Sequence, residues 1–185
     1  MSISNFSSHL IFKSNSIEYF SAIEHLYHDA YSKGFSEQYI DKANLEIYIS
    51  DILKHGNAIF VKDNNIFKAC LLYTPLSLDY QCPQQIRSNF NLEKCVYIAE
   101  IMVAEPFRGQ GFGKLLMKSF FETIEYQYYT DAFIRVWEEN LPAIKLYENF
   151  DFEKYTSIEQ TKTKPDGESD FLMKKIYLHR PLFKE

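Results

Sequence analysis

Three of the six glycines in this 185-residue chain fall within five residues, at Gly109, Gly111 and Gly113. Glycine lets consecutive backbone N–H groups point into one concavity, because no Cβ atom stands in the way. A helix that leaves such a turn adds unpaired N–H groups and the positive end of its dipole. Arg108 and Lys114 add positive charge. The segment therefore predicts a phosphate or pyrophosphate site; the alternative is a tight strand-to-helix turn with a solvated arginine.

The glycine spacing excludes the best-known nucleotide-binding loops. The Rossmann pattern G-x-G-x-x-G needs its third glycine one residue later than Gly113. The P-loop needs a glycine five residues before Gly113 and a Ser or Thr in place of Leu115. The H-R-D and D-F-G motifs of protein kinases do not occur. The expected anion site is therefore of another kind.

One carboxylate lies inside the apolar strand that leads into the glycine turn. Glu100 is the only charged residue between Lys94 and Glu105. A carboxylate in such a strand is unfavourable unless it is paired or hydrated, and it is a residue type that can accept a proton in catalysis. We therefore predict that Glu100 is a general base. The alternatives are a structural ion pair and a position at an opening of the sheet.

The pattern Arg108-x-x-Gly111-x-Gly113, behind a strand ending in I-M-V and ahead of L-L-M-K-S-F, resembles the acetyl-coenzyme A motif of the GNAT superfamily of N-acetyltransferases. The segment Asn140–Phe152 resembles the second motif of that superfamily, N-x-x-A-x-x-x-Y-x-x-x-G-F. Asp151 stands where the glycine is usual. Asp tolerates left-handed backbone, so we expect the turn to persist. The resemblance covers about a third of the chain, from Lys94 to Phe152.

The resemblance implies a single domain over residues 1–185 with an α/β fold, in which helices flank both faces of a mixed, mostly antiparallel sheet. It also implies acetyl-coenzyme A (acetyl-CoA) as cosubstrate and no metal. The backbone of the preceding strand is expected to hold the pantetheine, the glycine loop the pyrophosphate, and an asparagine side chain another part of the cofactor. These cofactor-binding residues are Ile101, Met102 and Val103, then Arg108, Gly109, Gln110, Gly111, Phe112, Gly113 and Lys114, and finally Asn140.

By the same resemblance, the expected reaction is direct transfer of an acetyl group to a primary amine of a small molecule or peptide. Glu100 is the predicted general base and Tyr147, the motif tyrosine, the predicted general acid. The residues alone favour Tyr147 as a core aromatic whose hydroxyl reaches solvent and Asn140 as a helix N-cap; the resemblance favours the catalytic and cofactor roles. Two alternatives stay open for the function: a non-catalytic acyl-CoA-binding or sensing module, and an acyltransferase that uses a different acyl-CoA.

The family's acceptor contacts come from the first two helices, their connection and the final hairpin. This implies an apolar or aromatic acceptor-binding wall formed by Tyr31, Phe35 and Tyr39; the alternative is that these three rings only pack in the core. The long segment 74–93 between two strands is a second candidate, with Asp79, Tyr80 and Arg87. The Lys174–Lys175 pair is interpreted as a solvated strand end.

Hydrophobic periodicity predicts the elements around these residues. Helical spacing covers 16–33, 36–54, 112–124 and 140–150, with Gly34 closing the first helix and Ser36 capping the second. The apolar positions of the second helix are Tyr39, Ile40, Ala43, Ile47, Ile52 and Leu53. Strands are expected over 9–13, 57–61, 66–73, 94–103, 132–137, 152–162 and 169–176, the last two joined by a turn at 163–168.

Composition sets the remaining expectations. Hydrophobic residues make up 46% of the chain, which excludes a disordered tail or a disulfide miniprotein. The net charge of −5 disfavours a general nucleic-acid binder. Cys70 and Cys95 lie in apolar runs and are expected to be buried thiols. No signal peptide or run of 18 apolar residues is found, so we expect a cytoplasmic protein without a membrane partner. The 155–177 hairpin offers an edge for a homodimer, as any exposed edge does.

Overall fold

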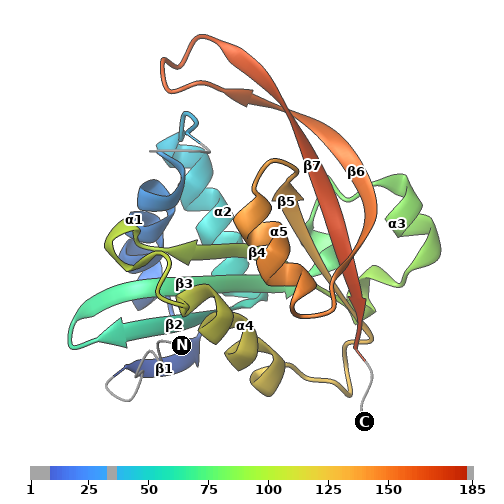
Figure 1. Ribbon diagram of the computed structural model, residues 1–185, viewed down its shortest axis with the longest axis horizontal. Helices are drawn as coiled ribbons and strands as arrows, with labels where there is room; N and C mark the ends of the chain where they lie inside the picture. The colour runs from blue at the N-terminus through green and yellow to red at the C-terminus, as the bar shows by residue number, and fades with distance from the viewer. Residues whose placement is uncertain (1–8, 33–36, 183–185) are drawn as a thin grey trace.

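The computed structural model describes residues 9–32 and 37–182, which form one seven-stranded sheet (Figure 1). The strand order is β1-β2-β3-β4-β5-β7-β6, and only β4 and β5 are parallel. The elements in chain order are β1 (Leu10–Ser14), η1 (Ile17–Tyr19), α1 (Phe20–Tyr31), α2 (Lys42–His55), β2 (Asn57–Asp63), β3 (Ile66–Pro75), η3 (Leu76–Leu78), α3 (Gln84–Asn89), η4 (Leu92–Lys94), β4 (Cys95–Val103), η5 (Glu105–Phe107), α4 (Phe112–Thr123), β5 (Asp131–Trp137), α5 (Leu141–Glu148), β6 (Glu153–Thr163) and β7 (Asp170–Pro181).

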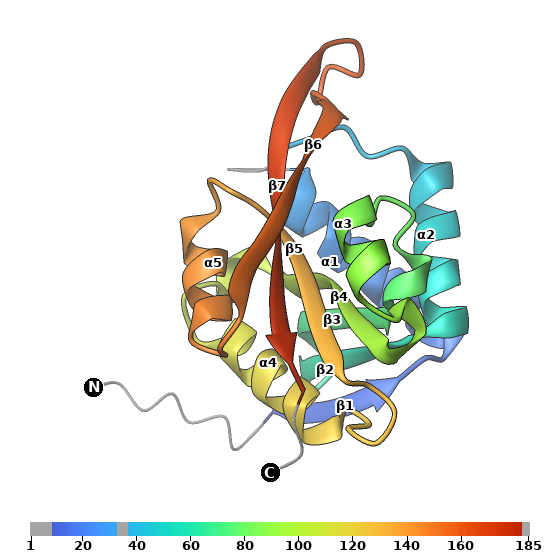
Figure 2. The same ribbon diagram turned by 90° about the vertical axis from the view of Figure 1, so that its right-hand side faces the viewer.

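Helices cover both faces of the sheet, as predicted (Figure 2). Helices α4 and α5 pack on one face, where Leu116 and Phe120 of α4 are fully buried against β2–β5 and β7. Helices α1 and α2 pack on the other face, where Ile23 and Ile49 are fully buried. Burial of each large apolar side chain contributes roughly 1.5–3 kcal/mol, so these two layers fix the sheet between them. The expected mixed, mostly antiparallel fold is confirmed.

The second helix differs from its expected start and face. It begins at Lys42, and Asp41 caps it by accepting a hydrogen bond from Asn44 N at 2.8 Å. Ser36, the predicted cap, and Gly34 lie outside the described residues. The buried positions are Leu45, Ile49, Ile52 and Leu53, whereas Ile47 is 62% exposed. The four buried residues are spaced at i, i+4, i+7 and i+8, and Ile47 lies two residues from that stripe, on the other side of the helix.

The segment between β3 and β4 is structured. It contains η3, α3 and η4, and it forms a third apolar cluster in which Leu76, Ile86 and Phe133 are fully buried. Arg87 fixes the segment internally, because its Nε and Nη2 donate to Cys82 O at 2.8 Å and to Asp79 O at 3.0 Å. This cluster covers the sheet beside α1 and α2 (Figure 2).

A β-bulge in β4 sets the direction of Glu100. Leu72 pairs with Glu100 while the next residue of β3, Tyr73, pairs with Ile98, so Ala99 is the extra residue. Before the bulge, Val96 and Ile98 face α4 and α5. A regular strand would turn Glu100 toward that same face, because side chains alternate with period 2. The bulge shifts the phase, and Glu100 instead shares the α1 and α2 face with Met102.

The last two strands form a long hairpin that rises above the rest of the sheet (Figure 1). Its turn follows the expected chemistry: Asp166 Oδ1 accepts from Glu168 N at 2.9 Å and from Ser169 N at 2.8 Å. The hairpin is tied to the segment before α2, because Tyr39 N donates to Thr163 O at 2.9 Å.

Two further observations concern the whole described chain. Cys70, Cys82 and Cys95 are buried free thiols, as expected for Cys70 and Cys95. Within residues 9–32 and 37–182, no helix is long and apolar enough to cross a membrane.

Candidate active site

The candidate site lies where β4 and β5 separate. The parallel pairing joins Cys95–Ile98 to Asp131–Ile134 and ends there. Beyond it, β4 keeps its partner β3 up to Val103, but no strand of the described part of the chain pairs with it on the β5 side, so that edge leaves backbone groups available. A cavity of about 1010 Å³ opens at this point, lined by α1, α2, β4, β5, α5 and the β6–β7 hairpin. The two diverging strands are visible in Figure 1.

The glycine loop connects β4 to α4. Gly109 and Gly111 have φ angles of 73° and 89°, in the left-handed region that favours glycine. A Cβ atom on Gly109 would meet no atom within 4 Å, so the loop surface is open there. Among the described residues, no acceptor is found for the backbone N–H groups of Gly109, Gln110, Gly111, Gly113 and Lys114. The first N–H bonded within the helix is Leu115 N, which donates to Gly111 O at 3.0 Å.

Gly113 has a different role from the other two glycines. It lies in the first turn of α4, and a Cβ atom there would come within 3.0 Å of Leu146 Cδ2 on α5. It therefore allows the close approach of two helices. The N–H groups of the loop and first helical turn form a cradle that fits a pyrophosphate. The free edge of β4, with Ile101, Met102 and Val103, fits an extended chain such as pantetheine.

Two polar side chains of the loop are engaged by the protein itself. Arg108 donates from Nε to Val103 O at 3.1 Å and from Nη2 to Asp29 O at 2.9 Å. Gln110 Nε2 donates to Pro106 O at 2.9 Å. These contacts hold the loop against the end of β4 and against α1, so both side chains help to shape the cradle.

Glu100 is held by two tyrosines from different helices. Tyr31 OH on α1 donates to Oε2 at 2.5 Å, and Tyr48 OH on α2 donates to Oε1 at 2.9 Å. Burial, followed by the negative charge of Glu100, raises the pKa of both phenols well above 10. Both tyrosines therefore stay protonated and act as donors. Among the described residues, no Lys, Arg or His nitrogen lies within 4.0 Å of the Glu100 carboxylate. The interpretation of Glu100 as one half of a structural ion pair therefore loses its support.

Tyr147 and Asn140 enter the cavity from α5. Tyr147 is 7% exposed, and it lines the cavity opposite β4. Burial, with a smaller contribution from Glu100, raises the pKa of its phenol. Asn140 caps α5, because its Oδ1 accepts from Ala143 N at 3.3 Å. Asp151, at the usual glycine of the second motif, has φ of 59°, so the expected left-handed turn is present.

Comparison with known proteins identifies the family. The sequence model of the Acetyltransferase (GNAT) family matches residues 20–152. The chain belongs to the GNAT acetyltransferase family. It is therefore an acetyltransferase by family, and the expectation from the two motifs is confirmed. A comparison with curated protein sequences gives no significant match.

Solved structures share the fold at low sequence identity. The ribosomal-protein-S18-alanine N-acetyltransferase from Escherichia coli superposes with a TM-score of 0.68 at 17% identity, and the match covers 96% of each chain. The ribosomal-protein-alanine N-acetyltransferase from Brucella melitensis superposes with a TM-score of 0.69 at 16% identity, and the match covers 94% of this chain and 99% of that one. A GNAT family acetyltransferase from Elizabethkingia anophelis with acetyl-CoA bound superposes with a TM-score of 0.62 at 18% identity, and the match covers 95% of this chain and 99% of that one.

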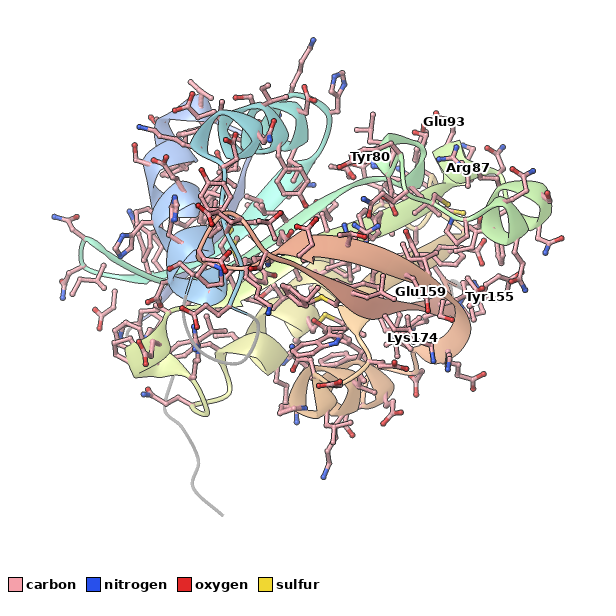
Figure 3. The ribbon with its side chains drawn as sticks, turned by 90° about the horizontal axis from the view of Figure 1, so that it is seen from above. Tyr80, Arg87, Glu93, Tyr155, Glu159 and Lys174 are labelled. Carbon is pink, nitrogen blue, oxygen red and sulfur yellow. The ribbon has the colours of Figure 1, made fainter. Side chains whose placement is uncertain are left out.

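Within this GNAT acetyltransferase, two of the three predicted acceptor residues line the cavity. Tyr31 lines it and also holds Glu100. Tyr39 lines it and is 51% exposed. Phe35 lies outside the described residues. Of the second candidate set, Asp79 and Tyr80 line the cavity, and Arg87 instead fixes the segment before β4 (Figure 3).

A buried polar network, which the sequence did not reveal, borders the cavity. Arg135 Nη1 on β5 contacts Asp79 Oδ1 at 3.3 Å, Gln81 Oε1 at 2.8 Å and Tyr177 OH at 2.9 Å. Tyr177 OH donates to Asp79 Oδ2 at 2.7 Å. The Asp79 side chain is only 3% exposed. No local pattern relates these residues, because they are brought together from three separate parts of the chain.

The interpretation of Lys174 and Lys175 as a solvated strand end is wrong for one of the two. Lys174 is exposed and pairs with Glu138 Oε2 at 2.9 Å. Lys175 is half-buried and lines the cavity, as does Lys162 of β6. Adjacent residues of a strand point to opposite faces, so the two lysines have different surroundings.

Proposed function

We propose that this protein transfers an acetyl group from acetyl-CoA directly to a primary amine of a small molecule or peptide. The observation that carries the proposal is the separation of β4 and β5. It brings a strand edge, a carboxylate and a buried tyrosine to one cavity, beside a loop in which five backbone N–H groups find no acceptor among the described residues. Direct transfer needs these parts: a site for the cofactor, a proton acceptor and a proton donor.

The glycine loop and the edge of β4 are the proposed cofactor site. The unpaired N–H groups of residues 109, 110, 111, 113 and 114 would bind the pyrophosphate, and the positive end of α4 favours its negative charge. The backbone of Ile101, Met102 and Val103 would hold the pantetheine. When bound, acetyl-CoA supplies the activated acetyl thioester.

Glu100 is the proposed general base. A carboxylate has about four lone-pair positions on its two oxygens. Tyr31 and Tyr48 occupy one on each oxygen and fix the carboxylate in the cavity. The remaining lone pairs are available to take the proton from an acceptor amine, directly or through one water.

Tyr147 is the proposed general acid. Because burial raises its pKa, the phenol keeps its proton throughout the neutral range. It is then a proton source for the sulfur that leaves when the acetyl group is transferred. Asn140, whose Oδ1 caps α5, retains its amide NH₂ group for a contact with the cofactor.

The test combines turnover with cofactor binding. Purified protein is assayed with acetyl-CoA and a panel of amines and amino acids by release of free thiol. Glu100→Gln keeps the shape of the side chain and is expected to lower kcat by about 100-fold or more, because it removes the base. Calorimetric affinity for acetyl-CoA should not change.

The matched control is Glu93→Gln, which makes the same substitution at an exposed position (Figure 3). It should leave both measurements unchanged. If Glu100→Gln turned over amines at the wild-type rate, the assignment of the base would be wrong. If the protein bound acetyl-CoA and acetylated no amine, a cofactor-binding or sensing module would replace the proposal.

A further inference from the structure

Three cationic side chains share one wall of the cavity. Arg135 of β5 pairs in register with Tyr177 of β7, and Lys175 is two residues away from Tyr177 on the same face. Lys175 pairs with Ile158 of β6, and Lys162 lies four residues further along β6 on that face. All three cations line the cavity, together with Glu100 on β4, the strand next to β5.

Most of this positive charge lacks a partner. Within residues 9–32 and 37–182, no carboxylate lies within 4.0 Å of the ammonium of Lys162 or Lys175. Arg135 uses Nη1 alone for its three contacts, and no acceptor is found among these residues for its Nε or Nη2. Several donors along this wall are therefore available to a ligand.

The carboxylates around the cavity are mostly engaged. Glu100 accepts from two tyrosines, Asp79 is bound by Arg135 and Tyr177, and Asp41 caps α2. Asp51 also lines the cavity, but it is exposed on α2. The cavity is thus negative at Glu100 on one side and positive along the hairpin on the other.

Leaving these ammonium groups half-buried has an energetic consequence. Burial lowers the pKa of Lys162, and burial together with the charge of Lys162 lowers the pKa of Lys175 to about 8. A buried charge is unfavourable unless it is paired. The charge of Glu100 opposes both shifts in part, and an anion in contact with the ammonium groups would reduce the penalty that remains.

We infer that the acceptor is a small amine that also carries a carboxylate, bound with its amine toward Glu100 and its carboxylate toward Lys162, Lys175 and Arg135. The inference rests on the proposed acetyl transfer, because it takes Glu100 as the end that receives the amine. An amine without an anion would meet repulsion from Lys162 and Lys175, whereas a dipolar acceptor matches both ends of the cavity.

The phosphates of the cofactor are a weaker explanation for these lysines. None of the residues 105–114 of the glycine loop lines this cavity. The loop follows β4 on the side of α4, whereas the three cations lie on the hairpin face that carries Tyr177 and the third apolar cluster.

The experiment compares acids with amides, in binding and in turnover. Each common L-amino acid is tested as acceptor beside its own carboxamide, which keeps the amine and the size but removes the charge. For the best pair, binding of the N-acetylated acid and the N-acetylated amide is measured by calorimetry. We expect the acid to have a kcat/KM at least about tenfold higher, because hydrogen bonds to charged groups are the strong ones.

The variants Lys162→Met and Lys175→Met should each raise the KM for the acid by about tenfold. They should also lower the ratio of kcat/KM for the acid to kcat/KM for the amide, and they should leave the KM for acetyl-CoA unchanged. Lys174→Met is the matched control, because this neighbour lies on the outer face of the hairpin, beside Glu159 in register (Figure 3). It should behave as wild type.

Each result decides between clear alternatives. Equal affinity for N-acetylated acid and amide, or binding of neither, overturns the inference. A rise in the KM for acetyl-CoA in the lysine variants would assign the lysines to the cofactor and also overturn it. Selective binding of the carboxylate without thiol release from any amine would instead contradict the proposed acetyl transfer, so the two failures are distinguishable.

Discussion

The two sides of the cleft are built in different ways. The proposed cofactor side consists of the backbone N–H groups of residues 109, 110, 111, 113 and 114 and of the edge of β4 that faces away from β3. The proposed acceptor side consists of side chains from α1, α2, η3, β4, β5 and the β6–β7 hairpin. A backbone site is determined by φ angles and is largely indifferent to side chains. A side-chain site depends on the packing of the whole fold.

This difference separates what the fold keeps constant from what it can vary. A cradle of N–H groups binds a pyrophosphate whatever the acceptor is. The acceptor wall can change through single residues on the hairpin without disturbing the cradle. Tyr147 of α5 lines the cavity, and as the proposed proton donor to the leaving sulfur of the cofactor it would serve both sides.

The largest effect is expected at Tyr147, the residue that would serve both sides. Tyr147→Phe removes the proposed proton donor and keeps the ring, so we expect kcat to fall by about 100- to 10,000-fold. The KM values for acceptor and acetyl-CoA should change little. Steady-state kinetics measures all three. Tyr128→Phe, which removes an exposed phenol, should match wild type. An unchanged kcat in Tyr147→Phe would show that Tyr147 is only a core aromatic and not the general acid.

The backbone geometry of the glycine loop could be predicted from the sequence because its information is local. Glycines at fixed spacing after an apolar strand specify a backbone shape within a few residues. The same holds for Asp151, whose left-handed φ of 59° agrees with its place in the motif. For these residues, pattern and physical cause lie in the same segment.

The sequence indicates Tyr31 and Tyr39 as acceptor-side residues and both line the cavity, but the contacts among the residues of this side could not be predicted because their information is not local. The sequence shows Glu100 as a lone carboxylate in an apolar strand, but the direction of its side chain depends on the extra residue Ala99, which is defined only by pairing with β3. Tyr48 and Tyr31 reach it from two different helices. Lys175 differs from Lys174 only by one step of strand alternation. Which of the two lysines faces the cavity follows only from the position of β7 between β5 and β6.

Stability should also differ between side-chain networks inside and outside the cavity. Asp79→Asn leaves Arg135 in a half-buried site with its carboxylate partner removed, so we expect a loss of about 3 kcal/mol or more. Urea unfolding measures it. Adding Arg135→Met to Asp79→Asn should recover part of the loss, because it removes the unpaired charge.

The control is the exposed pair Lys174–Glu138, whose side chains are 44% and 37% exposed. Glu138→Gln should lower stability by less than about 1 kcal/mol. A similar loss in Asp79→Asn and Glu138→Gln would mean that the Asp79 network does not hold the acceptor wall.

On the cofactor side, backbone should matter more than side chains. Gly111→Ala forces a left-handed φ of 89° on a residue with a Cβ atom, at a cost of about 1–2 kcal/mol. We therefore expect acetyl-CoA to bind about tenfold more weakly. Gln110→Ala and Lys114→Ala keep the N–H groups and should change the affinity by less. Calorimetry with acetyl-CoA compares the three. If Gln110→Ala or Lys114→Ala had the larger effect, the cofactor side would be a side-chain site after all.

The smallest expected effect is a dependence on pH that is confined to the acceptor side. The pKa of Lys175, at about 8, lies below its ordinary value, so the side chain loses its charge as pH rises through that range. The groups that face it are Lys162 on β6, Arg135 on β5 and Glu100 on β4. An N-acetylated amino acid has no titrating amine, so its binding reports the wall alone.

We expect its affinity to fall by up to about tenfold between pH 7 and pH 9.5, as one charged hydrogen bond is lost. A bound carboxylate favours the charged lysine, so the midpoint in the complex lies above 8. Lys175→Met should bind weakly and show a smaller fall, and Lys174→Met should follow wild type. Acetyl-CoA binding should lack this wall-dependent change, because backbone N–H groups do not titrate. A fall in acetyl-CoA affinity that Lys175→Met abolished would show that the two sides share Lys175 and are not separate.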